Sequence, residues 1–160
     1  MTPPVAMLIP FFVMFSWLGL MDTHIGLILA HVMLNLSIVV WLLRGFFVEL
    51  PREIEEASAL DGDTYFQTFR RITLPLAMPG LISVGILIFL LSWNEFLFAL
   101  VLGDSVVRTV PIGLYSFIGY QTIAWAELSA SATLLIIPII IFILIFQRHL
   151  IRGLTMGAYR

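Results

Sequence analysis

Few side chains in this 160-residue sequence are of the types that carry catalysis. Lysine is absent, which excludes a P-loop ATPase, a Schiff-base enzyme and a pyridoxal phosphate enzyme, because each needs a lysine. Without cysteine there is no thiol nucleophile, disulfide or thiolate metal site. The three histidines, at positions 24, 31 and 149, are too far apart for a zincin helix. The sequence therefore predicts no catalytic residue, no metal site, no cofactor and no enzyme activity of its own.

Four polar side chains stand inside apolar sequence, where they need partners: His31, Asn35, Asn94 and Glu95. His31 and Asn35 are one helical turn apart and share a face, which should point into protein or water rather than lipid. We favour hydrogen bonds between helices for this pair, with contact to a solute as the alternative. Glu95 would cost about 2.5 to 3.5 kcal/mol at a helix centre, so we expect it towards the outer edge of the bilayer core.

The composition indicates that lipid rather than water surrounds most of the chain. Hydrophobic residues make up 61% of the sequence and charged residues 11%, whereas soluble domains have about 25% charged residues. This composition excludes an ordinary cytoplasmic enzyme and a disordered tail. The net charge of −2, without a basic stripe, argues against a nucleic-acid partner.

Four apolar runs are long enough for transmembrane helices, which need roughly 20 residues to cross a core of about 30 Å. The third run contains Glu95, but the apolar pattern resumes after it and Pro79 suits a helix start, so we predict one helix there. We predict an all-α fold, a polytopic membrane helical bundle made by one domain of residues 1–160. Its transmembrane helices are predicted at residues 5–21, 25–47, 79–102 and 128–147.

The arginines predict the orientation of these helices. Four spans put both termini on one side of the membrane, and seven of the eight arginines then lie on that side, with Arg108 opposite. Positively charged loops stay in the cytoplasm. We therefore predict that both termini and residues 47–78 are cytoplasmic and that residues 22–24 and 103–127 are outside.

Residues 49–75 carry the local signals of two short helices outside the bilayer. Pro51 suits a first helical position, and Gly62 suits the left-handed residue that ends a helix. Asp63 or Thr64 can cap a second helix, which we expect Pro75 to end. A connector resting on lipid would favour a basic face, whereas this segment has six acids and three arginines. We predict a helical hairpin whose apolar faces require a partner protein.

The spacing within this hairpin resembles a known motif. Glu56-Ala57-Ser58, followed after three residues by Gly62 and after nine more by Ile72-Thr73-Leu74-Pro75, resembles the EAA loop of ABC importer permeases. The family usually has a second alanine at the position of Ser58. The resemblance implies that the hairpin is a coupling helix seated in a cleft of a cytoplasmic ATPase. The residues that it implies in this coupling are Glu56, Ala57, Ser58, Asp61, Gly62, Ile72, Leu74 and Pro75.

Three other segments resemble permeases of the carbohydrate type, such as the second membrane subunit of maltose importers: Asp22-Thr23, residues 93–96 and residues 147–158. The resemblance implies a subunit of a bacterial or archaeal inner membrane that moves a sugar or related small solute into the cytoplasm. The implied partners are ABC ATPase subunits, a second permease subunit, an extracytoplasmic solute-binding protein and membrane lipid. Subunits of this family usually have six spans, so we expect the chain to correspond to the C-terminal part of one.

Several alternatives stay open at the level of the sequence. The EAA loop indicates coupling to an ATPase but does not indicate which solute is moved. A permease for an amino acid or a peptide is therefore the first alternative. An autonomous channel, the second, would need no ATPase-docking hairpin. An intramembrane enzyme would need a catalytic constellation, and Glu95 is a single acid. Asn94 and Glu95 either lie near a translocation path or form structural hydrogen bonds within the subunit or to its partner subunit.

Overall fold

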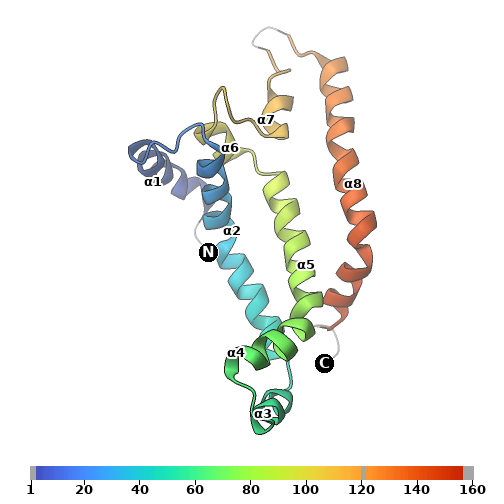
Figure 1. Ribbon diagram of the computed structural model, residues 1–160. Helices are drawn as coiled ribbons and strands as arrows, with labels where there is room; N and C mark the ends of the chain where they lie inside the picture. Colours follow the sequence, from blue (N-terminus) through green and yellow to red (C-terminus); the bar gives the residue numbers. More distant parts are fainter. Residues whose placement is uncertain (1–2, 120–121, 157–160) are drawn as a thin grey trace. The chain divides into compact units, whose positions relative to one another are not determined.

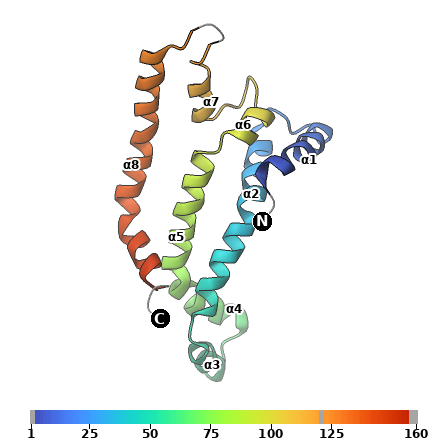
Figure 2. The ribbon, with the colours of Figure 1, turned by 180° about the vertical axis from the view of Figure 1, so that it is seen from behind.

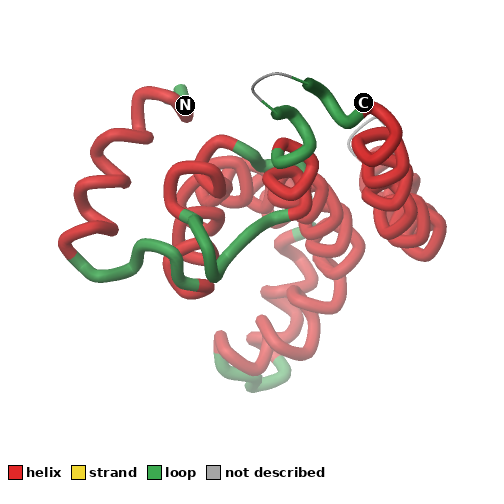
Figure 3. Tube along the Cα trace, turned by 90° about the horizontal axis from the view of Figure 1, so that it is seen from above, coloured by secondary structure: helices red, strands yellow, loops and turns green. Residues whose placement is uncertain are grey.

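The computed structural model describes residues 3–119 and 122–156, and most of these are helical (Figure 1, with the opposite view in Figure 2). The elements are α1 (Pro4–Trp17), α2 (His24–Val48), α3 (Arg52–Leu60), α4 (Tyr65–Thr68), the π-helical turn η1 (Phe69–Thr73), α5 (Leu74–Trp93), α6 (Leu97–Leu102), α7 (Val110–Tyr115) and α8 (Trp125–Met156). Figure 3 shows no strand in the described part of the chain, where Ile118 and Ile123 form an isolated bridge. The predicted all-α fold is confirmed.

Within residues 3–119 and 122–156, three helical segments are long and apolar enough to cross a membrane: His24–Val48, Tyr65–Trp93 and Trp125–Gln147. Their 25, 29 and 23 residues exceed the roughly 20 that a bilayer requires. Many of their large apolar side chains are exposed, as expected of helices whose outer faces meet lipid rather than water. The predicted fold class, a helical membrane bundle, is therefore confirmed.

α1 is shorter than the span predicted at residues 5–21. Its 14 residues extend about 21 Å at about 1.5 Å per residue. The helix ends because the chain turns after Trp17, where Gly19 and Asp22 both adopt positive φ angles of 66° and 52°. A left-handed residue cannot continue a right-handed helix.

The predicted single helix at residues 79–102 is wrong, because the structure has two helices there. α5 ends at Trp93 and α6 begins at Leu97. The Asn94 side chain donates to the Leu90 carbonyl, and the two Glu95 oxygens accept the backbone N–H groups of Phe98 and Ala99 at 2.8 and 3.0 Å. Glu95 thus satisfies donors that a helix start leaves unpaired, which favours a new helix over a continuous one.

The expectation that Pro75 ends the second hairpin helix is also wrong. The chain stays helical from Tyr65 to Trp93, and both Pro75 and Pro79 lie within that segment. The π turn η1 ends at Thr73, two residues before Pro75, and the Leu74 N–H donates to the Phe69 carbonyl five residues back. We attribute the continuity to this wider turn, because the proline lacks an N–H and its ring would otherwise clash with the carbonyl four residues earlier.

Two compact units divide the chain: residues 1–37 with 89–145, and residues 38–88 with 146–160. In the first unit, α1, α2 and α6 bury Phe15, Ala30, Phe98 and Leu102 in one cluster. In the second, a Cβ atom on Gly80 would lie 2.5 Å from ring carbons of Phe46. A glycine is therefore what lets α5 approach the end of α2 so closely.

Candidate functional site

The predicted helical hairpin at residues 49–75 is present, and local chemistry explains its shape. Pro51, which was predicted as a first helical residue, is instead the N-cap of α3, so the helix begins one residue later, at Arg52. Gly62 has a φ angle of +90° and lies between the two helices. Of the two predicted caps, Thr64 is the one used: its hydroxyl accepts the Gln67 N–H while the Gln67 side chain accepts the Thr64 N–H, a capping box.

A buried polar network joins the two arms of the hairpin. Ser58 is 4% exposed, and its hydroxyl donates to Asp63 Oδ2 at 3.1 Å. The hydroxyls of Ser58 and Thr68 lie 2.9 Å apart. Because Ser58 has one hydroxyl hydrogen, Thr68 is the donor in that second bond. Asp63 Oδ1 accepts from Arg71 at 3.0 Å. In the sequence, the one sign of this network was Ser58, a hydroxyl residue at a position where the family usually has alanine.

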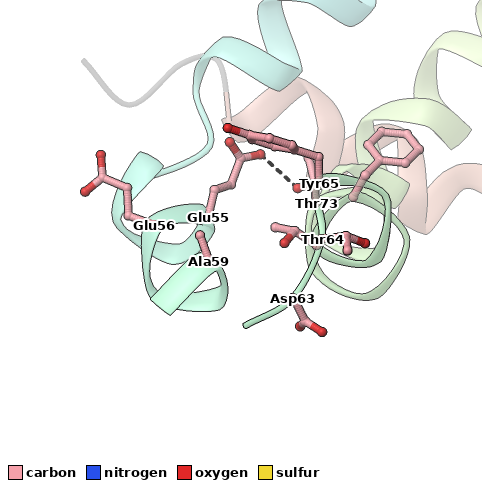
Figure 4. Close-up of a pocket in the computed structure, with 9 residues that line it drawn as sticks. Glu55, Glu56, Ala59, Asp63, Thr64, Tyr65 and Thr73 are labelled. Atoms are coloured by element: carbon pink, nitrogen blue, oxygen red, sulfur yellow. Dashed lines mark hydrogen bonds between the residues drawn. The ribbon is translucent and has the colours of Figure 1, made fainter. Parts of the chain in front are cut away.

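A hollow of about 690 Å³ opens between α3 and α4 (Figure 4). It is lined by Glu55, Glu56, Ala59, Asp63, Thr64, Tyr65, Thr68, Phe69 and Thr73. Tyr65, in this lining, is 96% exposed, and Leu60, which follows the lining residue Ala59, is 89% exposed. Exposed apolar side chains next to carboxylates give a surface suited to a protein partner with an apolar and basic face.

The coupling residues implied by the motif do not gather in one cluster. Glu56, Ala57, Asp61, Gly62 and Pro75 are exposed, whereas Ile72 and Leu74 are half-buried. Ser58 is buried between the arms, where its hydroxyl bonds Asp63 and Thr68. Figure 4 shows the Glu56 carboxylate pointing away from α4, whereas that of Glu55 points towards Thr73. The motif therefore combines surface residues with residues that hold the hairpin together.

A second polar cluster lies within the first unit. Asn35 Nδ2 donates to Ser92 Oγ at 3.1 Å and to the His31 carbonyl at 2.9 Å, which links α2 to α5. His31 Nε2 lies 3.9 Å from Glu95 Oε2. The His31 Nδ1 atom is 2.8 Å from the Leu27 carbonyl, so Nδ1 carries the proton and Nε2 is protonated only in the cationic form. The structure brings His31, Asn35 and Glu95 together and adds Ser92, while Asn94 is exposed and bonded to its own helix.

We expect Glu95→Gln to lower the thermal stability of the protein. The amide keeps one acceptor oxygen but turns an NH₂ group towards a backbone N–H, and a lost hydrogen bond to a charged group costs about 1.5 to 3 kcal/mol. Thermal unfolding in detergent measures the effect. Glu127→Gln, at an exposed acid in the first turn of α8, is the matched control. Unchanged stability in Glu95→Gln would contradict the structural role of these hydrogen bonds.

Asp22 forms a clasp that the sequence did not predict. Its carboxylate accepts the backbone N–H groups of residues 104–107 at 2.9 to 3.2 Å and the Ser105 hydroxyl at 3.1 Å. These hydrogen bonds, led by those of Val107 and Val106, hold the pKa of Asp22 well below its usual value of 3.8. The Asp22 N–H also donates to the Leu102 carbonyl at 2.7 Å. The turn after α1 is thereby tied to the loop after α6.

Together, the long apolar helices and the helical hairpin that joins α2 to α5 define a polytopic helical membrane protein. The chain belongs to the family of binding-protein-dependent transport system inner membrane components, whose sequence profile matches residues 1–156. This membership places it among multi-pass inner-membrane permeases.

Three relatives illustrate the similarity. The trehalose transport system permease protein SugB of Mycobacterium tuberculosis is 38% identical over 163 residues, which cover 100% of this chain and 60% of the relative. The probable ABC transporter permease protein y4oR of Sinorhizobium fredii is 36% identical over 158 residues, 99% of this chain and 57% of the relative. The trehalose/maltose transport system permease protein MalG of Thermococcus litoralis is 35% identical over 162 residues, 100% and 58%. The chain therefore spans somewhat more than half the length of these curated relatives.

Proposed function

We propose that this chain acts as a membrane-spanning permease subunit of an ATP-driven importer that moves a sugar or related small solute into the cytoplasm. Membership of the family of inner membrane components supports a role in transport. The names of two relatives, one for trehalose and one for trehalose and maltose, support a sugar as the solute. In this proposal the chain supplies a path and a mechanical link, and partner subunits hydrolyse ATP.

The observation that carries the proposal is the surface of the hairpin. Leu60 and Tyr65 are almost fully exposed beside a hollow with an acidic rim. A partner that covers them would remove apolar surface from water, which favours association. We assign that partner as the ATPase, with Glu56, Ala57, Asp61 and Gly62 on the contact side. Closure of the ATPase pair would move the hairpin as a lever and switch the spans between inward-facing and outward-facing states.

The proposal includes the orientation and the other partners. We propose that α1, α2, α5 and α8 cross the membrane and that the hairpin and both termini are cytoplasmic, which the distribution of arginines supports. A second permease subunit and an extracytoplasmic solute-binding protein would complete the transporter. The cluster of His31, Asn35 and Glu95 would join helices within this subunit, which its hydrogen bonds support.

Cross-linking from a single cysteine tests the coupling role. The sequence has no cysteine, so Leu60→Cys introduces a unique thiol at the tip of the hairpin. In membranes that contain the assembled transporter, we expect a thiol cross-linker to join Leu60→Cys to the ATPase, and a membrane-impermeant thiol reagent added from outside to leave it unlabelled. Ser116→Cys, at an exposed position after α7, should show the reverse. External labelling of Leu60→Cys, or no contact with the ATPase, would refute the proposal.

A further inference from the structure

The connection between the hairpin and α5 contains a joint. α4 passes into α5 through the π turn η1, in which the backbone hydrogen bond of Leu74 reaches five residues back to Phe69. A π turn inserts an extra residue into a helix, and such turns often occur at functional sites. Pro75, the second residue of α5, removes one more backbone donor. The helix is therefore continuous here but less constrained by its own backbone hydrogen bonds.

One side-chain hydrogen bond bridges this joint. The Thr73 hydroxyl, in the last position of η1, donates to Glu55 Oε1 on α3 at 2.8 Å (Figure 4). Thr73 is 6% exposed, so water competes little for its hydroxyl. The bond joins residues 18 positions apart, one on each side of Gly62. It ties α3 directly to the point at which the π turn becomes α5.

A second contact holds α3 farther from the joint. The Thr68 hydroxyl, at the residue directly before η1, bonds the Ser58 hydroxyl at 2.9 Å. These two attachment points, one at the residue before the π turn and one at its last residue, restrain both the position and the angle of α3 relative to the helix that enters α5. A third bond, from Arg71 in η1 to Asp63, is exposed to water and holds the loop after Gly62 rather than α3 itself. The Thr73 bond is therefore the contact that joins α3 to the end of the π turn.

We propose that Glu55 and Thr73 are positioning residues that brace the hairpin against α5 across the π turn, so that a displacement of α3 is passed to α5 rather than absorbed by the joint. This inference rests on the proposed coupling function. The inference gives two neighbouring acids different roles. Glu56 belongs to the outer surface, whereas Glu55 acts within the subunit through its bond to Thr73. Loss of the brace should leave ATPase docking intact and reduce the solute moved per ATP.

Thr73→Val and Thr73→Ser form the matched pair that tests the brace. Valine keeps the volume of threonine and removes the hydroxyl, whereas serine keeps the donor. In the assembled transporter, we expect Thr73→Val to lower the solute moved per ATP about fivefold, as loss of one ordinary hydrogen bond allows. Thr73→Ser should stay near the unchanged protein. Glu55→Ala should match Thr73→Val, and Glu55→Gln, which keeps an acceptor oxygen, should retain most of the coupling.

Two further measurements separate a brace from a general loss of structure. The double variant Glu55→Ala/Thr73→Val should be no worse than either single variant, because both remove the same bond. Spin labels on cysteines at the exposed positions Glu53 and Leu76 should give one narrow distance distribution, which Thr73→Val broadens and Thr73→Ser preserves. Unchanged coupling in Thr73→Val, additive losses in the double variant, or an unbroadened distribution would each overturn the brace. A failed Leu60→Cys cross-link in the unchanged protein would instead defeat the coupling function itself.

Discussion

Gly62→Val is expected to abolish solute uptake while the subunit still inserts into the membrane. Gly62 has a φ angle of +90°, and valine is a β-branched residue that adopts such angles rarely. Strain of this kind costs about 1 to 3 kcal/mol, so the turn should change its backbone and with it the angle between α3 and α4. ATP hydrolysis should continue without transport, which paired assays of ATPase activity and uptake in vesicles measure.

The reason for this effect is conformational rather than steric, which supplies sharp controls. A Cβ atom at Gly62 would have no other heavy atom within 4 Å, so side-chain size by itself is tolerated. Gly62→Asn should therefore keep most of the uptake, because asparagine adopts positive φ angles more readily than other residues. Gly85→Val, in α5 and also without close neighbours, controls for valine in this chain. Uptake by Gly62→Val at the level of the unchanged protein would contradict the role of this turn.

Asp22→Asn is expected to release the loop at residues 104–107. A carboxylate has two acceptor oxygens for the donors around it, whereas an amide has one and directs an NH₂ group at the rest. Hydrogen exchange at the amides of residues 104–107 should accelerate more than about tenfold, since these amides lose their acceptor. Asp104→Asn removes a charge from the same loop without removing the clasp and is the control. Unchanged exchange in Asp22→Asn would show that the loop does not depend on the clasp.

Acid sensitivity gives an independent measurement of the same clasp. The pKa of Asp22 in the folded protein lies well below the ordinary 3.8, because backbone N–H groups stabilise the carboxylate. The stabilisation by this group is therefore complete above pH 3.8 and is lost as the pH falls from there towards the folded pKa. We expect the melting temperature of the unchanged protein in detergent to fall as the pH is lowered below 3.8. In Asp22→Asn, the part of this fall that comes from Asp22 should be missing. Identical acid profiles would contradict the assignment.

The sequence by itself determined the medium of the protein and the local form of the hairpin. A composition with 61% hydrophobic residues implies lipid, and helices are what lipid permits for a chain segment that must satisfy its own backbone. Gly62 and Thr64 act within a few residues of their own positions, through a left-handed angle and a capping box. Such short-range chemistry can be predicted from the order of the residues: the left-handed Gly62 was predicted, and Thr64 was one of the two predicted caps.

Only the tertiary structure decided which distant groups meet. The Asp22 carboxylate binds residues more than 80 positions away, and Thr73 reaches Glu55 across the hairpin. The break after Trp93 depends on whether the Glu95 carboxylate accepts the N–H groups at the start of α6, which the sequence does not reveal. Hydropathy reports the solvent that a segment prefers, but it carries no information on hydrogen-bond partners, because these are fixed only when the packed helices bring donors within about 3 Å of acceptors.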